Sequence, residues 1–426
     1  MDQLLDSLSN SNYWEKDPGF NFGFIRDAYL SVIKKSLHNR LVKVLVGQRR
    51  AGKSYIVRQL INYLIRDLHV DGSNIFYLNK ELYEFERIKT DRQLFEVIQT
   101  YKEKYRPEGK IYYFIDEVQD IENWEKLVTS ISQDPSQDAE IFITGSNSSL
   151  LSGELASKLS GRYVSFEIFP FTYVEYLNFS HQKNSRQNFI KFLRGSGLPE
   201  TFNLKDKDIT RFYFQSLKDT ILLQDIMNRY QIRDAALLDD LFLFILHNIG
   251  NLTSIPSIIK YYKSRNRKTD YSTLSNYLSY IENSFIIHSS PRYFIKHKET
   301  LSGERKYYVN DLGFRNYLYP NLESEISSAL ENTVYIHLLK SGYEVYTGYG
   351  RNFEIDFLAI KPDHRIYVQV SYLLESKNTI EREFGAYNYI RDFHQKYVIS
   401  MDELQIGDYS GIKHIPVWDF LYELDT

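Results

Sequence analysis

Residues 41–54 read LVKVLVGQRRAGKS, a short apolar run that passes into a glycine-rich loop. The run is β-branched and of strand length, and the residues after Ser54 carry apolar side chains at helical spacing. The loop from Gly47 to Ser54 fits the pattern G-x-x-x-x-G-K-[ST], in its required place between a strand and a helix. The segment therefore predicts a strand–loop–helix unit whose loop binds phosphate groups.

The residue types of this loop suit a nucleotide. Glycines let the backbone wrap around phosphates, while N–H groups and the helix N-terminus point at the anion. We expect Lys53 to place its charge on the β- and γ-phosphates of ATP and the Ser54 hydroxyl to be a ligand of Mg²⁺. The alternative is an incidental glycine-rich turn before a helix. The predicted nucleotide-binding residues are Gly47, Gln48, Arg49, Arg50, Ala51, Gly52, Lys53, Ser54 and Tyr55.

Short apolar strands alternate with amphipathic helices as far as about Pro170. This alternation is typical of a parallel sheet, and with the loop it predicts an α/β P-loop NTPase domain with helices on both faces of the sheet. The predicted strands are residues 41–46, 75–78, 111–115, 141–144 and 164–168.

The strand IYYFI is followed directly by Asp116 and Glu117. Acidic side chains at the end of a buried strand suit a hard cation at the carboxyl edge of a parallel sheet. We expect Asp116 to hold Mg²⁺ directly or through water, and Glu117 to orient and deprotonate the attacking water. The alternative is a solvated pair of strand-end carboxylates.

Two further polar residues are candidate catalytic groups. Asn147 follows the next strand and would reach the γ-phosphate or the attacking water, with Ser146 as the second choice and a plain turn as the alternative. Arg162 would neutralise transition-state charge, either in its own chain or in a neighbouring subunit. The alternative for Arg162 is an ordinary surface arginine.

The segments GQRRAGKS, IDEVQDIENWEKLV, FITGSN and SGRYVSFEIFPFTYVEYL resemble the AAA-type ATPases of bacteria and archaea that carry a C-terminal domain of unknown function. LRGSGLPE (193–200), ILLQDIMNRY (221–230), KYYVNDLGFRN (306–316) and the region 331–371 resemble later segments of that family. The resemblance covers about residues 41–374. It implies an ATPase of the additional-strand, catalytic-glutamate class, which agrees with Glu117 beside Asp116. The role of that family is largely unassigned, so the resemblance supplies no biological function.

The composition of the chain excludes several classes of protein and of functional site. The 426 residues carry a net charge of −3, so the chain as a whole does not suit a polyanion. Cysteine is absent, which excludes disulfides, thiolate zinc sites and a cysteine nucleophile. No secretory signal and no apolar run of ~18 residues is visible, so we expect a cytoplasmic protein without a membrane segment. We expect an N-terminal segment (1–30), the ATPase domain (31–180), a helical linker with a winged helix-turn-helix domain (181–320) and a small α/β domain (321–426).

The segment from Asn251 to Asn310 has the order of a winged helix-turn-helix, and its part from Lys260 to Lys306 is basic. Two helices (253–262 and 272–283) precede two strands (285–292 and 306–309) around a polar tip at 302–305. Such a basic segment is typical of contact with a phosphate backbone and predicts binding of duplex DNA. The alternative is a packing or protein-contact module. Ten basic residues (Lys260, Lys263, Arg265, Arg267, Lys268, Arg292, Lys296, Lys298, Arg305, Lys306) face four acids (Asp270, Glu282, Glu299, Glu304), a balance of +6.

The C-terminal region resembles the restriction-endonuclease-like fold. Glu331 lies on a predicted helix, and Glu354 and Asp356 lie on a predicted strand. Active members carry Glu-x-Lys or Asp-x-Lys on the next strand, where this chain has Gln369 and Ser371. Glutamine is a poor Mg²⁺ ligand beside a carboxylate, and serine supplies no cation. We therefore expect this domain to fold as a nuclease does and to cut nothing.

Glu375 and Lys377 repeat the Glu-x-Lys spacing six residues further on, and we expect them to lie beyond the strand. The leading hypothesis is a Mg²⁺-dependent ATPase coupled to a DNA-facing or partner-facing winged helix. The second is a nucleotide-gated interaction protein that hydrolyses slowly and signals by its ATP-bound state. The third is a nucleic-acid processing enzyme with a working nuclease. A homo-oligomer or a protein partner stays open.

Overall fold

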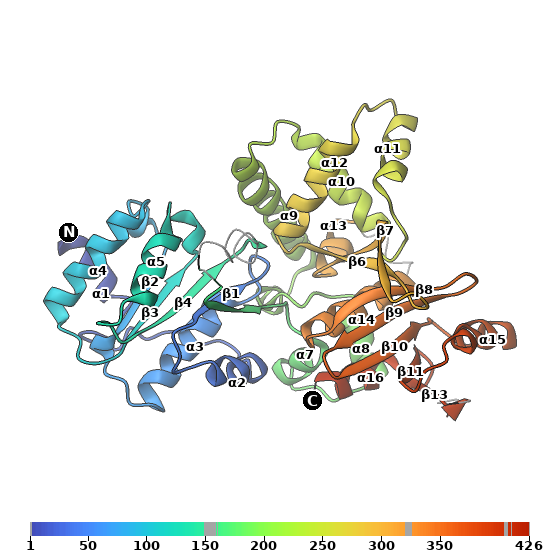
Figure 1. Cartoon of the computed structure of the whole chain (residues 1–426), viewed down its shortest axis with the longest axis horizontal. Coiled ribbons are helices and arrows are strands. Elements are labelled where there is room, and N and C mark those ends of the chain that lie inside the picture. Colours follow the sequence, from blue (N-terminus) through green and yellow to red (C-terminus); the bar gives the residue numbers. More distant parts are fainter. Residues whose placement is uncertain are drawn as a thin grey trace. The chain divides into compact units, whose positions relative to one another are not determined.

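The computed structural model describes residues 2–148, 159, 161–319, 326–403, 408–409 and 411–425. The chain forms two compact units, Met1–Ile168 and Phe169–Thr426 (Figure 1). Among the described residues, no helix has both the length and the apolar composition that crossing a bilayer requires.

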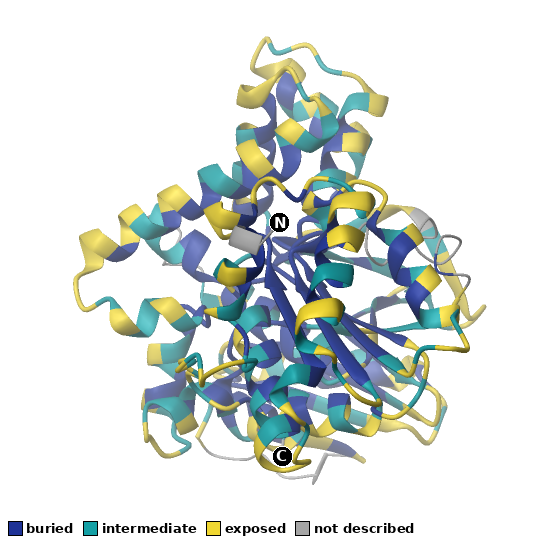
Figure 2. Cartoon of the chain, turned by 90° about the vertical axis from the view of Figure 1, so that its left-hand side faces the viewer, coloured by how far each residue is buried: buried dark blue, intermediate teal, exposed yellow. Residues whose placement is uncertain are grey.

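The first unit is built on a five-stranded sheet in which every neighbouring pair of strands is parallel. The order is β2-β3-β4-β1-β5, so one strand, β4, separates β1 from β3. Strands β1, β2 and β3 are buried along their whole length, as apolar strands covered on both faces are (Figure 2). The predicted α/β fold is confirmed. The strands are β1 (Val42–Val46), β2 (Ile75–Asn79), β3 (Ile111–Asp116), β4 (Ala139–Gly145) and β5 (Tyr163–Glu167).

The helices of this unit follow from apolar residues at helical spacing. In the helix after the loop, Ile56, Leu60 and Leu64 recur every four residues and are buried. The N-terminal segment covers the open edge of β2, where the Asn12 side chain pairs with the backbone of Tyr77 and the Trp14 indole donates to the Ile75 carbonyl. The helices are α1 (Asp2–Ser9), α2 (Asp27–Lys35), α3 (Lys53–Arg66), α4 (Asp91–Tyr105) and α5 (Trp124–Gln133).

The second unit combines a helical part with an eight-stranded mixed sheet of order β12-β13-β11-β10-β9-β8-β6-β7. Its apolar core runs continuously from the helical part to the sheet. The helices are α7 (Tyr173–Phe179), α8 (Arg186–Leu193), α9 (Lys207–Asp219), the π-helix η6 (Thr220–Asn228), α10 (Ala235–His247), α11 (Ile255–Ser264), α12 (Tyr271–Asn283), α13 (Gly313–Leu318), α14 (Ile326–Lys340), α15 (Lys377–Gly385), the 3₁₀ helix η8 (Ala386–Tyr389) and α16 (Val417–Asp425). The strands are β6 (Ile287–Phe294), β7 (Glu299–Val309), β8 (Glu344–Tyr349), β9 (Glu354–Lys361), β10 (His364–Val370), β11 (Gln395–Ser400), β12 (Asp408–Tyr409) and β13 (Ile412–Pro416).

The β6–β7 hairpin differs from its prediction in two ways. Its tip lies at residues 295–298 instead of 302–305, because β7 begins at Glu299 and Phe294 pairs with Glu299. The polar residues of β7 hid this longer strand from a hydrophobic pattern. The hairpin is also no free wing, since β6 pairs in parallel with β8 and so shares a sheet with strands beyond residue 320.

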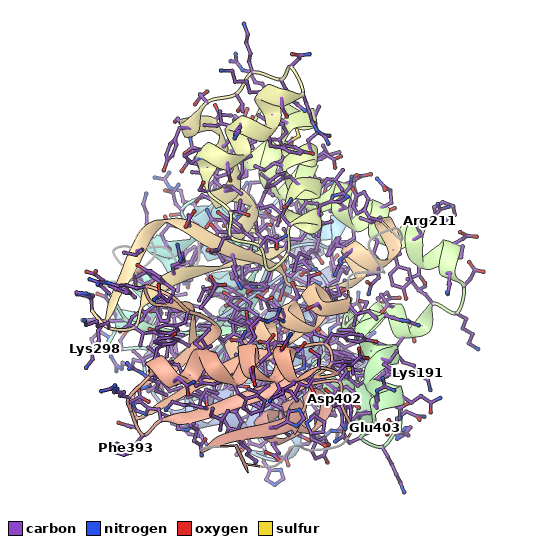
Figure 3. The ribbon with its side chains drawn as sticks, turned by 90° about the vertical axis from the view of Figure 1, so that its right-hand side faces the viewer. Lys191, Arg211, Lys298, Phe393, Asp402 and Glu403 are labelled. Atoms are coloured by element: carbon purple, nitrogen blue, oxygen red, sulfur yellow. The ribbon has the colours of Figure 1, made fainter. Side chains whose placement is uncertain are left out.

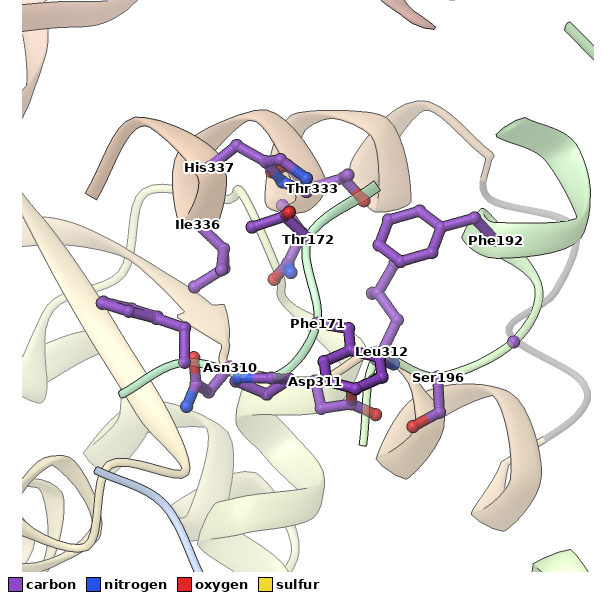
Figure 4. A pocket seen from close by; sticks show the side chains of 15 residues that line it. Phe171, Thr172, Phe192, Ser196, Asn310, Asp311, Leu312, Thr333, Ile336 and His337 are labelled. Atoms are coloured by element: carbon purple, nitrogen blue, oxygen red, sulfur yellow. Dashed lines mark hydrogen bonds between the residues drawn. The ribbon is translucent and has the colours of Figure 1, made fainter. Parts of the chain in front are cut away.

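Two of the segments that carried the family resemblance meet inside the second unit. The Gly197 N–H donates to Asp311 Oδ2 at 2.7 Å, and the Asn316 amide donates to the Gly195 carbonyl at 2.9 Å. They line a cavity of about 40 Å³ near Phe171 (Figure 4). A space of that size holds little more than water. Burial raises the pKa of Asp311 to about 6, although the Ser196 hydroxyl and backbone N–H groups oppose the rise.

Candidate functional site

The predicted phosphate loop turns from β1 into α3 with two glycines at positive φ. Gly47 has φ +143°, and a Cβ there would lie 2.3 Å from the Ile168 carbonyl oxygen, so no other residue fits. Gly52 has φ +102° and directly precedes Lys53, the first residue of α3. The backbone therefore has the strand–loop–helix path that the sequence predicts.

Lys53 is 4% exposed and lies at the centre of the site. Its Nζ donates to the carbonyls of Gly47 at 3.0 Å and Gln48 at 3.3 Å, and lies 3.5 Å from Oε1 of Glu117. The lysine thus joins the loop to the predicted general base. Arg26 supports the loop from the N-terminal segment, since its guanidinium donates to the Ala51 carbonyl at 3.0 Å.

Asp116 ends β3 and is buried beside β4. The Thr144 hydroxyl donates to its Oδ1, and the Tyr77 hydroxyl donates to its Oδ2 at 3.2 Å. Burial, and then the charge of Glu117, raise the pKa of Asp116, while the hydroxyls of Thr144 and Ser54 lower it. A bound cation would offset the repulsion between the two neighbouring carboxylates, so Asp116 suits a cation as a partner.

Glu117 has φ +56°, a left-handed conformation that costs an ordinary residue about 1–2 kcal/mol. Its N–H donates to the Thr144 hydroxyl at 3.0 Å, and its Oε2 accepts from the Gln119 amide at 2.6 Å. Burial alone would raise its pKa, but Lys53 and Gln119, with smaller contributions from Arg49 and Ser146, outweigh burial and lower the pKa. Glu117 is therefore ionised at neutral pH, as a general base must be.

Ser146 and Asn147 are the two candidate catalytic residues that follow β4. Ser146 is 2% exposed, and its hydroxyl is a hydrogen-bond partner of Glu117. Asn147 is fully buried beside it, and its contact with nucleotide stays a prediction. Thr144 was not predicted as a site residue, although it stands in the same TGSN motif and links Asp116 to the backbone of Glu117.

Arg162 does not lie at this edge of the sheet. Strands β1 and β5 pair in parallel from Val42–Tyr163 to Val46–Glu167, and the Arg162 carbonyl accepts from the Val42 N–H. Arg162 is therefore about five residues, roughly 16 Å along the strands, from the loop edge. It is exposed, and the geometry gives no support to a role in its own chain. A role across a subunit boundary stays a prediction.

The residues present fit a Mg²⁺–nucleotide. The Gln48 carboxamide is buried in the loop with no hydrogen-bond partner among the described residues. A buried amide without a partner is costly, so a bound group that supplies one would stabilise it. The Ser54 hydroxyl lies close enough to Asp116 to lower the pKa of that carboxyl. Both side chains offer oxygen atoms, the ligand type that Mg²⁺ prefers.

Two residues that support the site were not predicted from the sequence. Arg26 precedes α2 and Tyr77 lies inside β2, and neither belongs to a motif. Only the folded sheet brings Tyr77 beside Asp116, because β2 and β3 are neighbours in register. A buried arginine at residue 26, 2% exposed, carries no local signal that the sequence alone would show.

The region that the sequence predicts to resemble a nuclease contains a lysine beside its predicted carboxylates. Lys306 of β7 places its Nζ 3.0 Å from Glu331 Oε1, 3.1 Å from Glu354 Oε1 and 3.4 Å from Asp356 Oδ1. Gln369 is nearby, since its Oε1 accepts from the Asp356 N–H at 3.2 Å. The prediction that no lysine completes this group is therefore wrong, because a strand 50 residues earlier supplies it.

The displaced pair does not take part. Lys377 begins α15 with an 88% exposed side chain, and it pairs with Glu381 at 3.7 Å. Glu375 is exposed as well. Both lie beyond β10, which ends at Val370, as expected.

Part of the predicted basic segment is already neutralised. Arg267 pairs with Asp240 and with Asp234 at 3.1 Å, and these acids lie outside the segment. Arg292 pairs with Glu304 at 2.7 Å. Glu304 is already counted in the balance of +6, but the acids that pair with Arg267 and Lys306 are not. The balance of +6 therefore overstates what the surface offers to a partner.

Comparisons with known proteins identify the family of the chain and of its first domain. The model of the AAA domain family matches residues 39–177, and the model of the domain of unknown function DUF8612 matches residues 186–326. A Haemophilus influenzae protein of uncharacterised function is 33% identical over 405 residues, which cover 93% of this chain and 98% of that protein. The chain belongs to that protein's family. Residues 39–177, which match the AAA domain family, form an AAA-type domain.

A second similar protein is less identical to this chain. A Methanocaldococcus jannaschii protein, likewise uncharacterised, is 28% identical over 375 residues, covering 84% of this chain and 81% of its own. Solved structures with similarity include a Cdc6 protein of Pyrobaculum aerophilum (TM-score 0.30, 13% identity, 77% of this chain and 97% of that one) and the ADP form of the Aeropyrum pernix ORC2 protein (TM-score 0.38, 9% identity, 74% and 96%).

Proposed function

We propose that the chain is a Mg²⁺-dependent ATPase whose nucleotide state controls a DNA-facing or partner-facing surface. The observation that supports it is the convergence of Lys53, Asp116 and Glu117 at the carboxyl edge of one parallel sheet. Each of these side chains is buried, and each contacts another of the three or the hydroxyl of Thr144. Structural packing alone gives no reason to bury two adjacent carboxylates beside a lysine.

Each residue has a distinct role in this proposal. The loop N–H groups and Lys53 bind the phosphates, and Ser54 and Asp116 hold Mg²⁺, which supplies charge stabilisation to the transferring phosphoryl group when bound. Glu117 Oε1 accepts the proton of the attacking water. A phosphate that takes Lys53 as its partner leaves Glu117 held by Gln119 and Ser146, free of its ion pair.

The Lys53–Glu117 ion pair favours a second candidate, a nucleotide-gated interaction protein with slow hydrolysis. A base that is paired until nucleotide arrives would act slowly if the pair re-forms during the cycle. Steady-state turnover with and without duplex DNA distinguishes the two functions. An ATPase that acts on DNA is stimulated by it, whereas a gated interaction protein turns over slowly in both conditions.

We propose that the basic residues of the α11–α12 region form the DNA-facing or partner-facing surface. These two helices and the β6–β7 hairpin follow one another in the order of a winged helix. Lys263, Arg265 and Lys268 are exposed there. Their reversal to glutamate should weaken duplex binding across all sequences, and wild-type affinity should fall steeply between ~50 and ~200 mM salt. A wild-type chain that retards no duplex at low salt, with or without ATP, would make this region a protein contact.

We propose a trans role for Arg162, a cytoplasmic location and an inactive nuclease-like region. If Arg162 completes the site of a neighbouring subunit, turnover per chain rises with protein concentration and Arg162→Ala spares ATP binding. In the nuclease-like region, the Lys306 ammonium lies where three carboxylates converge, so their charge is offset by the chain itself.

A further inference from the structure

A cavity of about 570 Å³ lies in the second unit, and neither the ATPase site nor the predicted nuclease group uses it. Four segments line it: the tip of the β6–β7 hairpin (294–298), the β8–β9 turn (350–353), β10 at Arg365 and Tyr367, and the end of η8 with the residues that follow it (389–392 and 394). We refer to it as the hairpin cavity. Its volume is within the ~300–1,000 Å³ of pockets that bury small organic ligands.

The lining of the hairpin cavity is strongly basic. Among the described residues, none of its five lysines and arginines is in an ion pair. Its one acid, Asp392, already accepts from the Tyr367 hydroxyl at 2.7 Å and from Lys396 Nζ at 3.0 Å. In a chain of net charge −3, this is a local reversal of sign. The basic lining residues are Lys296, Lys298, Arg351, Arg365, Arg391 and His394.

Aromatic rings stand exposed beside these charges. Tyr389 is 59% exposed and stacks on Phe353 with ring centroids 5.1 Å apart and planes 5° apart. Phe393 is fully exposed next to the lining residue Asp392. Figure 3 shows Phe393 and Lys298 along the same edge of the unit. Exposure of apolar rings to water is unfavourable. These rings therefore suit a partner that covers them.

We infer that the hairpin cavity binds single-stranded nucleic acid. Phosphates contact the guanidinium and ammonium groups that make no ion pair, while bases stack on Tyr389 and Phe393, since every base has a face that an aromatic ring accepts. A duplex keeps its bases stacked inside and presents none to a cavity. An acidic peptide satisfies the charges but leaves the rings uncovered.

This site goes beyond the proposed ATPase and does not depend on nucleotide. It shares Lys296 and Lys298 with the basic segment, so the charge variants are taken from the part of the lining that the segment lacks. Arg351 and Arg391 are both exposed and both outside residues 260–306.

The test is fluorescence anisotropy of the full-length chain with a labelled oligothymidylate of about 12 nucleotides, within the ~4–16 that a single-strand groove covers. We expect Tyr389→Ala and Phe393→Ala each to weaken binding by about 5- to 100-fold, and Tyr389→Phe to retain it. Reversing both Arg351 and Arg391 to glutamate should lower the salt slope by about 1.4. Circular dichroism of each variant confirms folding.

A matched control carries the same change of charge elsewhere. Lys191 and Arg211 are exposed and lie away from Lys298 and Phe393 (Figure 3), so their double reversal to glutamate should leave affinity within about twofold. The inference is overturned if the alanine variants bind as the wild type does, if a duplex of equal length binds more tightly through the same residues, or if poly-glutamate displaces the oligonucleotide as well as unlabelled oligothymidylate does. Absence of binding at low salt overturns it too.

Discussion

Lys306→Met removes the one positive charge that three carboxylates share. Lys306 is 6% exposed, and burial alone would lower its pKa, but Asp356, Glu331 and Glu354 together raise it. Methionine keeps the length and the apolar stem of the side chain. The change therefore isolates the ammonium group from the packing of β7.

The magnitude follows from the burial of the partners. Side chains of Glu331 and Asp356 are 16% and 13% exposed, whereas that of Glu354 is 37% exposed and solvent screens much of its contribution. Breaking a buried ion pair by removing one partner costs about 3–5 kcal/mol. We expect the lower end, about 3 kcal/mol at pH 8, because Glu331 can take up a proton.

The pH dependence distinguishes electrostatics from packing. Burial and the charge of Asp356 already raise the pKa of Glu331 to about 7, although Lys306 lowers it. Without Lys306 this pKa rises further, so the folded variant holds its proton where the unfolded chain releases it. The stability of the variant is then retained at low pH and lost as the pH rises through the folded pKa. The deficit against the wild type should be smaller at pH 6 than at pH 8.

Urea unfolding at both pH values measures the deficit. Lys298→Met, an exposed lysine at the tip of the same hairpin, is the matched control and should change stability by no more than about 0.5 kcal/mol. Adding Glu331→Gln to Lys306→Met should recover part of the loss, and the double-mutant cycle should give a coupling of about 1–3 kcal/mol. A deficit below about 1 kcal/mol at pH 8, or one equal at both pH values, would refute the reasoning.

Four further outcomes are expected. Lys53→Ala should abolish or severely weaken ATP binding by calorimetry, because the loop loses the cation that we propose to bind the phosphates; undiminished binding would rule out the site. Glu117→Gln should keep ATP bound and stop hydrolysis, and near-normal turnover would show that another group positions the water. Asp311→Asn mimics the protonated acid, so its urea-unfolding stability relative to the wild type should improve by up to about 3 kcal/mol between pH 4 and pH 7, where the wild type loses the benefit of a pKa raised to about 6; a constant difference would contradict this. The wild type should not cut single- or double-stranded DNA or RNA with Mg²⁺ or Mn²⁺, and cleavage that Asp356→Ala abolishes would establish an active nuclease.

Local sequence patterns predicted the loop between β1 and α3 and the end of β3 in the first unit. The strand–loop–helix unit is contiguous, and Gly47 and Gly52 stand at two of its positive-φ positions, the third being Arg50 at φ +69°. Most of the path of residues 41–66 therefore follows from their own sequence. The same holds for Asp116 and Glu117, which follow a buried strand directly. The alternation of apolar strands and amphipathic helices predicts the fold, because the side chains of each element determine which of its faces is buried.

Tertiary structure alone decided which distant residues meet. Thr144 reaches Asp116 only because β4 lies beside β3, and Arg162 is at the far end of the sheet because β5 runs parallel to β1. Lys306 joins Glu331 and Asp356 across 25 and 50 residues of chain. A motif of fixed spacing detects a lysine two positions along a strand, but an ammonium from another strand satisfies the same carboxylates. Charge is offset by proximity in space, and a linear pattern carries no record of that proximity.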